Sequence, residues 1–111
     1  MELEELALCT REEIEKEINK MCPYPANPKN PYEWDSVFHE RVNIRQSLKR
    51  LQIEALLDGK LTVDQVLEQQ YSEDDEGGVS RDCLERAIEE VKEGGSRYEI
   101  IDRIFEYMEL L

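Results

Sequence analysis

Carboxylates are the residues of this sequence whose number and spacing could do chemistry. The chain of 111 residues holds 27 Asp and Glu against 14 Lys and Arg, a formal net charge of −13. Two rows of acids recur every three or four residues in its last third, a spacing that places side chains about 5–6 Å apart on one face of a helix. The first row is Asp82, Glu85, Glu89 and Glu93, and the second is Glu99, Asp102, Glu106 and Glu109.

Carboxylates at that separation imitate the successive phosphates of a nucleic-acid strand. Such a face predicts binding to a basic surface, for example the channel of a nucleic-acid-handling enzyme, with association accelerated by long-range attraction and weakened by salt. The simpler alternative is ordinary intrahelical pairing, Glu99 with Arg103 and Asp82 with Arg86, on the solvent side of amphipathic helices. The candidate partner-binding residues are Glu73, Asp74, Asp75, Glu76, Glu85, Glu89, Glu93, Glu99, Asp102 and Glu106.

A basic stripe interrupts this acidic chain. Between Arg41 and Arg50 there are four basic residues and no acid, and Arg41, Arg45 and Lys49 are spaced by four. We expect the stripe to lie against acids of the first or last helix, or of a second subunit. The alternative is a docking site for an acidic partner, since arginine makes bidentate contacts to carboxylates and phosphates.

Residues that could catalyse or hold a metal ion are sparse. The single histidine, His39, has no second histidine at the spacing of a zinc-protease helix. The acidic segment after Ser72 does not fit a twelve-residue calcium loop, because Cys83 would stand where a bidentate Glu is required. We therefore expect a protein that is not an enzyme and that uses no metal ion or cofactor.

Charge and cysteine content predict the surroundings of the protein. A net charge of −13 argues against direct binding to nucleic acid or to anionic lipid. Cys9, Cys22 and Cys83 are an odd number at unrelated spacings, which suits reduced thiols better than a disulfide framework. No apolar run approaches the roughly 20 residues of a membrane span. These features predict a cytoplasmic protein without a membrane segment.

Apolar residues recur with a helical period throughout, and no segment alternates as a strand would. Capping patterns start helices at Thr10, Thr62, Ser80 and Ser96, and Gly59 and Gly94 end two of them. The longest pattern extends from Pro31 to Asp58. A further turn or two of helix is expected from about Glu2, continuous with the first helix or kinked near Thr10.

All four prolines lie between residues 23 and 31, with Tyr24 among them and Tyr32 and Trp34 shortly after. Asn30 and Glu33 are expected to cap the long helix, with Pro31 at its first position. We interpret residues 22–31 as a rigid strap that sets the angle between the first helix and the long one. The alternative is a recognition loop, because stiff proline-rich segments also present themselves to partners.

The sequence thus predicts an all-α, single-domain bundle over residues 1–111, with about five helices, a long central helix, the strap and an acidic glycine loop at 72–79. In size and charge the chain resembles the small acidic helical inhibitors and regulators of phages and mobile elements, although no specific motif carries the resemblance. The predicted function is inhibition or regulation of a protein with a basic surface, by phosphate mimicry. The alternative is a helical adaptor or homodimeric assembly protein acting through apolar faces, with Phe105, Met108, Leu110 and Leu111 as contacts.

Overall fold

The computed structural model of the chain describes residues 2–70 and 79–109, and the side chains as far as Glu106. The described residues form helices and no strand, which confirms the predicted all-α bundle with a long central helix. The turn of helix expected at the N-terminus is a separate element. The helices are α1 (Leu3–Leu6), α2 (Arg11–Met21), α3 (Tyr32–Leu57), α4 (Val63–Gln69), α5 (Arg81–Lys92) and α6 (Arg97–Glu109).

Three helices begin where side chains satisfy their unpaired backbone amides. The amide of Glu13 donates to the Thr10 hydroxyl over 3.3 Å at the start of α2, and Ser80 accepts in the same way at α5. At α4, Thr62 and Gln65 form a complete capping box, in which each side chain accepts from the other residue's amide. These local bonds confirm the helix starts predicted at all three positions.

Gly59 ends α3 in the left-handed conformation, with φ of 80°. The turn allows the amide of Lys60 to donate to the Ala55 carbonyl over 2.8 Å, the bond that defines a Schellman motif. A residue with a Cβ is strained at this φ, which is why glycine stands there. The chain can then reverse into α4.

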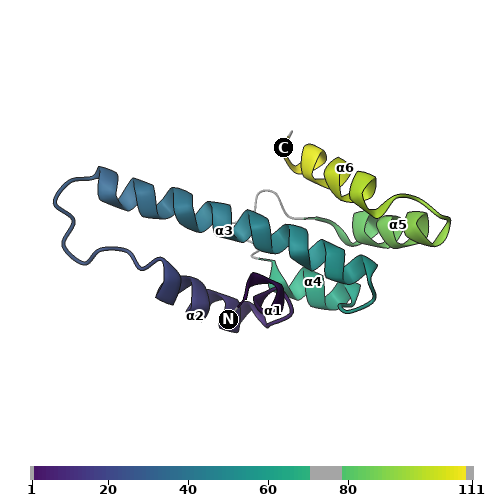
Figure 1. Cartoon of the computed structure of the whole chain (residues 1–111), viewed down its shortest axis with the longest axis horizontal. Coiled ribbons are helices and arrows are strands. Elements are labelled where there is room, and N and C mark those ends of the chain that lie inside the picture. The colour runs from purple at the N-terminus through teal and green to yellow at the C-terminus, as the bar shows by residue number, and fades with distance from the viewer. Residues whose placement is uncertain (1, 71–78, 110–111) are drawn as a thin grey trace.

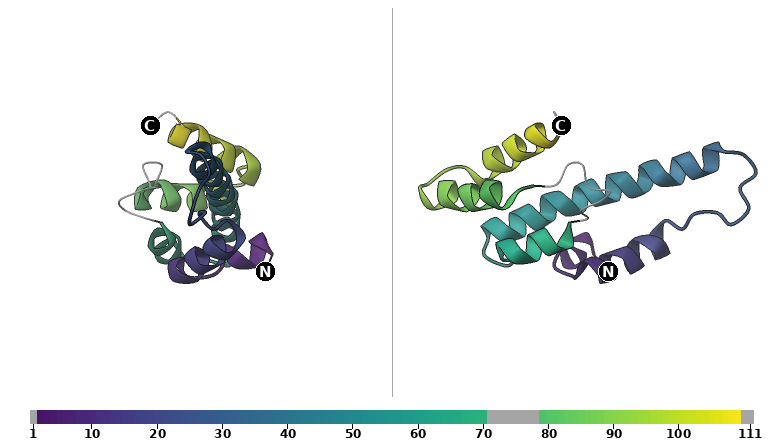
Figure 2. Two further views of the ribbon diagram at one scale, coloured as in Figure 1. Left: turned by 90° about the vertical axis from the view of Figure 1, so that its left-hand side faces the viewer. Right: turned by 180° about the vertical axis from the view of Figure 1, so that it is seen from behind.

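Helix α3 lies along the long axis of a molecule that measures 54 × 29 × 22 Å (Figure 1). The other helices cover it in two groups. Helices α1 and α2 lie on one side of its middle, and α6 lies on the opposite side (Figures 1 and 2). The first turns of α3 project beyond both groups and are accompanied only by residues 22–31.

Two separate hydrophobic clusters follow from this arrangement. The larger joins the end of α3 to α4, α5 and α6, with Leu84 and Ile101 completely buried. The smaller joins α1 and α2 to the middle of α3 around Leu6, Ile18 and Leu48. Helix α3 is therefore the element shared by both clusters.

Gln69, buried at the end of α4, ties the two clusters together. Its Nε2 donates to the carbonyls of Ala7 and Cys9 over 2.8 and 2.7 Å. These carbonyls follow the short helix α1 and have no regular helical partner, so the amide replaces the bonds that a longer helix would supply. Its Oε1 is buried and accepts from no described group.

The proline segment is held along the start of α3 by side chains of that helix. The Trp34 indole donates to the Pro25 carbonyl over 3.0 Å, and the amide of Lys29 donates to the Glu33 carboxylate over 2.8 Å. Arg41 donates to the Cys22 carbonyl over 3.0 Å. Residues 22–31 thus run antiparallel to α3 as a pinned strap.

The predicted cap of α3 was wrong in detail. Pro31, with φ of −62°, is itself the N-cap residue, and no side chain caps the helix. Glu33 is drawn instead to the amide of Lys29, which the neighbouring strap presents to it. The sequence pattern at Asn30 therefore predicts where the helix begins, but not the hydrogen bond that Glu33 accepts.

Candidate partner-binding surface

Helices α5 and α6 form a hairpin whose inner faces are fixed by the larger cluster. Leu84 and Ala87 of α5 and Ile100, Ile101 and Ile104 of α6 are buried in it. Because the core fixes the rotation of each helix about its axis, the opposite faces have a defined direction. Both predicted rows of acids lie on those outer faces, and every member whose side chain is described is exposed.

The row on α5 borders a shallow depression. Asp82, Glu85 and Glu89 line it together with Arg86 and Ile88. Glu93, one turn further along, is the C-cap residue and is also exposed. A basic group entering this depression would therefore meet three carboxylates on neighbouring turns of one helix.

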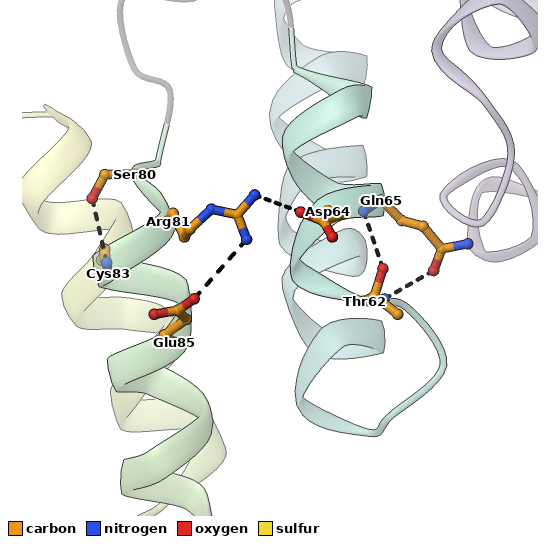
Figure 3. A network of polar contacts seen from close by, with 7 residues as sticks. All are labelled: Thr62, Asp64, Gln65, Ser80, Arg81, Cys83 and Glu85. Atoms are coloured by element: carbon orange, nitrogen blue, oxygen red, sulfur yellow. Dashed lines mark hydrogen bonds and ion pairs between the residues drawn. The ribbon is translucent and has the colours of Figure 1, made fainter.

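Arg81 partly screens the start of that row. Its guanidinium pairs with Asp64 of α4 and lies 4.0 Å from Glu85, so it joins α4 to α5 (Figure 3). The hydrogen bond that Arg81 donates to Asp64 raises the pKa of the guanidinium above its ordinary value. Of the acids around the depression, Glu85 is the one that forms an ion pair with an arginine among the described residues.

The row on α6 is less uniform than the sequence predicts. Glu99, Asp102 and Glu106 are exposed, but Asp102 lies 2.8 Å from the guanidinium of Arg50 on α3. This pair connects α6 to the long helix. The row therefore offers two outward carboxylates, at Glu99 and Glu106, with a paired one between them.

The intrahelical pairs considered for these acids do not form among the described residues. Arg103 pairs with Glu90 of α5 over 3.1 Å rather than with Glu99, and Arg86 makes no ion pair with Asp82. Within the described part of the chain, five acids of the two rows take part in no ion pair: Asp82, Glu89, Glu93, Glu99 and Glu106.

A groove of about 360 Å³ separates the two rows. Its floor includes Cys83, Ala87 and Ile104, and its rim includes Arg86 and Arg103. The groove is also lined by Asp82 and by Glu90, which pairs with Arg103, so its two arginines are balanced by two acids. The two rows therefore do not merge into one acidic surface. The α5 row, with its depression, is the more continuous of the two.

Part of the predicted surface lies outside the described residues. This is true of the acidic loop Glu73, Asp74, Asp75 and Glu76, and of the side chain of Glu109. The structure also does not describe three of the four contacts of the alternative prediction, namely the side chain of Met108 and residues Leu110 and Leu111. The fourth of these contacts, Phe105, is half-buried against the larger cluster, with Arg50 over its ring at 5.8 Å.

The basic stripe of α3 is engaged within the molecule. Arg41 is buried, donates to the Cys22 carbonyl and stacks over the Tyr24 ring at 5.1 Å. Arg45 pairs with Glu15 of α2. Lys49 is half-buried and also has an interaction partner. Arg41 and Arg45 are thus used to hold the strap and α2, and are not free for the acidic partner of the alternative interpretation.

The thiols show no activation. Burial raises the pKa of Cys9, Cys22 and Cys83 above the ordinary value of 9.0, and nearby glutamates add to the effect at each. A thiol is nucleophilic only as the thiolate, so the raised pKa values keep all three in the unreactive form at neutral pH. His39 is exposed and contacts only the edge of Phe38 among aromatic rings of the described residues.

Within residues 2–70 and 79–109, no three His, Cys, Asp or Glu side chains come together as metal ligands would. Over the same ranges, no helix combines the length and apolar character needed to cross a bilayer.

Comparison of the chain with protein-family models, with curated proteins and with solved structures finds no match. Its function must therefore be inferred from the chemistry of its own surface.

Proposed function

We propose that this protein binds a basic surface of another protein and thereby inhibits or regulates it. The observation that supports this is the α5 row, where Asp82, Glu89 and Glu93 are exposed and take part in no described ion pair. The favoured target class is a nucleic-acid-handling enzyme, because its substrate channel already binds anions spaced as these are.

Because α5 is held rigidly, its carboxylates would favour partners whose basic groups have the matching spacing. Leu84 and Ala87 fix the helix on the core, so its carboxylates need not be ordered when a partner binds. Long-range attraction between the acidic protein and a basic channel would raise the association rate. Added salt would lower that rate, since exposed charges are screened beyond about 8 Å at physiological ionic strength.

Inhibition follows from occupancy. A channel filled by a folded helix hairpin cannot admit nucleic acid, and the protein itself is not a substrate. No covalent step or cofactor is needed for this mode of action.

The experiment compares two triple variants with the same net charge. One reverses the proposed surface, Glu89→Lys, Glu93→Lys and Glu106→Lys. The control reverses three exposed acids elsewhere, Glu4→Lys, Glu12→Lys and Glu68→Lys, which also take part in no described ion pair. Each tagged protein is used to capture partners from its native cells at low and at high salt.

We expect a partner that is captured by the wild type and by the control but lost by the surface variant. With the purified partner, the surface variant should bind at least about tenfold more weakly at low salt, the loss of a few favourable charge contacts. Equal loss in both variants would show that total charge, not the α5 and α6 faces, governs binding. Equal retention would refute the proposal.

A further inference from the structure

A second surface lies at the other end of the molecule, where the strap meets the start of α3. Four large apolar side chains are about half-exposed there: Met21 at 45%, Tyr24 at 47%, Trp34 at 51% and Phe38 at 54%. We call these four residues the aromatic edge. The largest apolar patch on a typical monomer covers roughly 300–600 Å² and is often a functional surface.

The four residues of the aromatic edge are related through α3 and through Arg41. Trp34 and Phe38 are four residues apart and therefore neighbours on one face of α3. Tyr24 is joined to the same face by Arg41, whose guanidinium lies over its ring and which follows Phe38 by three residues. Met21 immediately precedes Cys22, whose carbonyl accepts from Arg41.

The aromatic edge is also held in place before any partner arrives. The indole of Trp34 is fixed by its bond to the Pro25 carbonyl, and Tyr24 is fixed by the stacked guanidinium. Rigid aromatic side chains supply contact area at a low cost in conformational entropy, which is the property of residues that dominate protein interfaces.

The acidic excess of the chain lies outside this end of the molecule. Residues 20–41 contain three basic and three acidic residues, Lys20, Lys29 and Arg41 against Glu33, Asp35 and Glu40. The whole net charge of −13 therefore belongs to other residues. The acidic excess lies in residues 1–19, with seven acids against two basic residues, and in residues 71–111, with thirteen against five. These segments repel a second copy of this chain, whereas the aromatic edge offers it a neutral, apolar surface.

The shape of the molecule reduces the remaining repulsion. The aromatic edge and the α5–α6 hairpin lie at opposite ends of the 54 Å axis (Figures 1 and 2). Two copies that meet at their aromatic edges can point their hairpins in opposite directions. Charges so far apart are screened, because the Debye length is about 8 Å at physiological salt.

The exposed area matches what a dimer needs. Large side chains of this kind, when half-exposed, each leave roughly 100 Å² in solvent, which gives on the order of 400 Å² for the four. A standard interface buries roughly 800 Å² on each partner, of which a little over half is apolar. The aromatic edge alone therefore supplies about the apolar share of one such interface.

We infer that the aromatic edge is the contact of a symmetric homodimer, in which Trp34 and Phe38 of one copy pack against the same residues of the other. This interface is different from the C-terminal apolar face around Phe105, and it does not depend on the basic partner of the α5 row.

The test measures the mass of the purified protein by sedimentation equilibrium between about 10 μM and about 1 mM, the range in which interfaces of this size and modest affinity dissociate. We expect the mass to rise with concentration from 13.1 kDa toward twice that value. Raising the salt should preserve or strengthen the dimer, because its contacts are apolar and its net charges are alike.

Phe38→Asp places two like charges across the symmetry axis and should weaken the dimer at least tenfold, while Phe38→Ala should weaken it less. The matched control is Tyr98→Asp on α6, a side chain that is 60% exposed and lies outside the aromatic edge. Trp34, the only tryptophan, should show a blue shift of its fluorescence with concentration in the wild type and the control.

A mass that stays at the monomer value throughout would overturn the inference, as would a dimer unaffected by both Phe38 variants. If circular dichroism showed that Phe38→Asp had lost helicity, the sedimentation result for Phe38→Ala alone would decide whether the aromatic edge forms the dimer contact. None of these outcomes bears on the basic partner, so failure here and failure of the proposed function are distinguishable.

Discussion

Arg50 of α3 and Asp102 of α6 form an ion pair, with Nη2 and Oδ1 2.8 Å apart. The same guanidinium lies over the Phe105 ring at 5.8 Å. The last helix is thus attached to the long one by a charged and an aromatic contact of a single residue. One acid predicted to meet a partner is instead part of the internal structure.

Asp102→Asn should lower the free energy of unfolding by up to about 1 kcal/mol, because the pair is largely exposed and such pairs contribute little. Glu106→Gln, which removes a charge from the same face without breaking a described pair, should leave stability unchanged. Urea denaturation of both variants provides the comparison. Equal losses of unfolding free energy in the two variants would mean that the pair between Arg50 and Asp102 does not stabilise the fold.

Gln69→Glu should destabilise the protein by about 2–4 kcal/mol. The carboxylate cannot donate to the Ala7 and Cys9 carbonyls, and it places a buried charge against two oxygens. The matched control is Gln65→Glu in the same helix, where a glutamate can still accept from the Thr62 amide. Thermal denaturation of the two variants should separate them clearly; similar melting temperatures would contradict the role of Gln69.

Arg41→Lys should loosen the strap and cost about 1 kcal/mol, because lysine keeps the charge but loses the planar group. That group stacks on Tyr24 while it reaches the Cys22 carbonyl. Faster amide exchange should appear at the ordered amide of Lys29 and in the first turns of α3. As a control, Arg86→Lys on α5 replaces an exposed arginine and should change neither exchange nor stability.

Stability should fall as the pH rises above 9.0, the ordinary pKa of a thiol. Burial raises the pKa of Cys9, Cys22 and Cys83 in the folded protein, so the unfolded chain loses these protons first. The folded state is therefore favoured fully below the ordinary pKa and progressively less as the pH passes through the raised values. Urea denaturation at pH 8 and at pH 10 measures the loss of stability.

The control for this pH dependence is a Cys83→Ala variant. It should lose less of its stability over the same pH interval, and an identical loss would show that this thiol does not contribute.

Local structure was predictable from the sequence because its causes are local. The Thr62–Gln65 capping box and the turn at Gly59 depend on residues within a few positions of one another, and both occur as expected. The rows of acids likewise follow from helical spacing. The apolar periodicity predicts the buried faces of α5 and α6, and therefore also the exposed faces that carry the acids.

Contacts between distant residues were not predictable in this way. Nothing near Gln69 indicates that it bonds to Ala7, and nothing near Arg103 favours Glu90 over Glu99. Such choices depend on how the helices pack. The burial of Arg41 is the clearest case, since its stripe was expected to lie against acids, whereas Arg41 is buried and donates to the Cys22 carbonyl of the strap.

The separation of the neutral end from the remaining charge has a further consequence. Residues 20–41 carry no net charge while residues 79–109, at the other end of the molecule, hold nine acids against five basic residues, so the molecule has an electric dipole along α3 (Figure 1). In the field of a basic protein it experiences a torque that turns the strap away. The aromatic end would then trail outward as the acidic end arrives, and a second copy could still be attached to it.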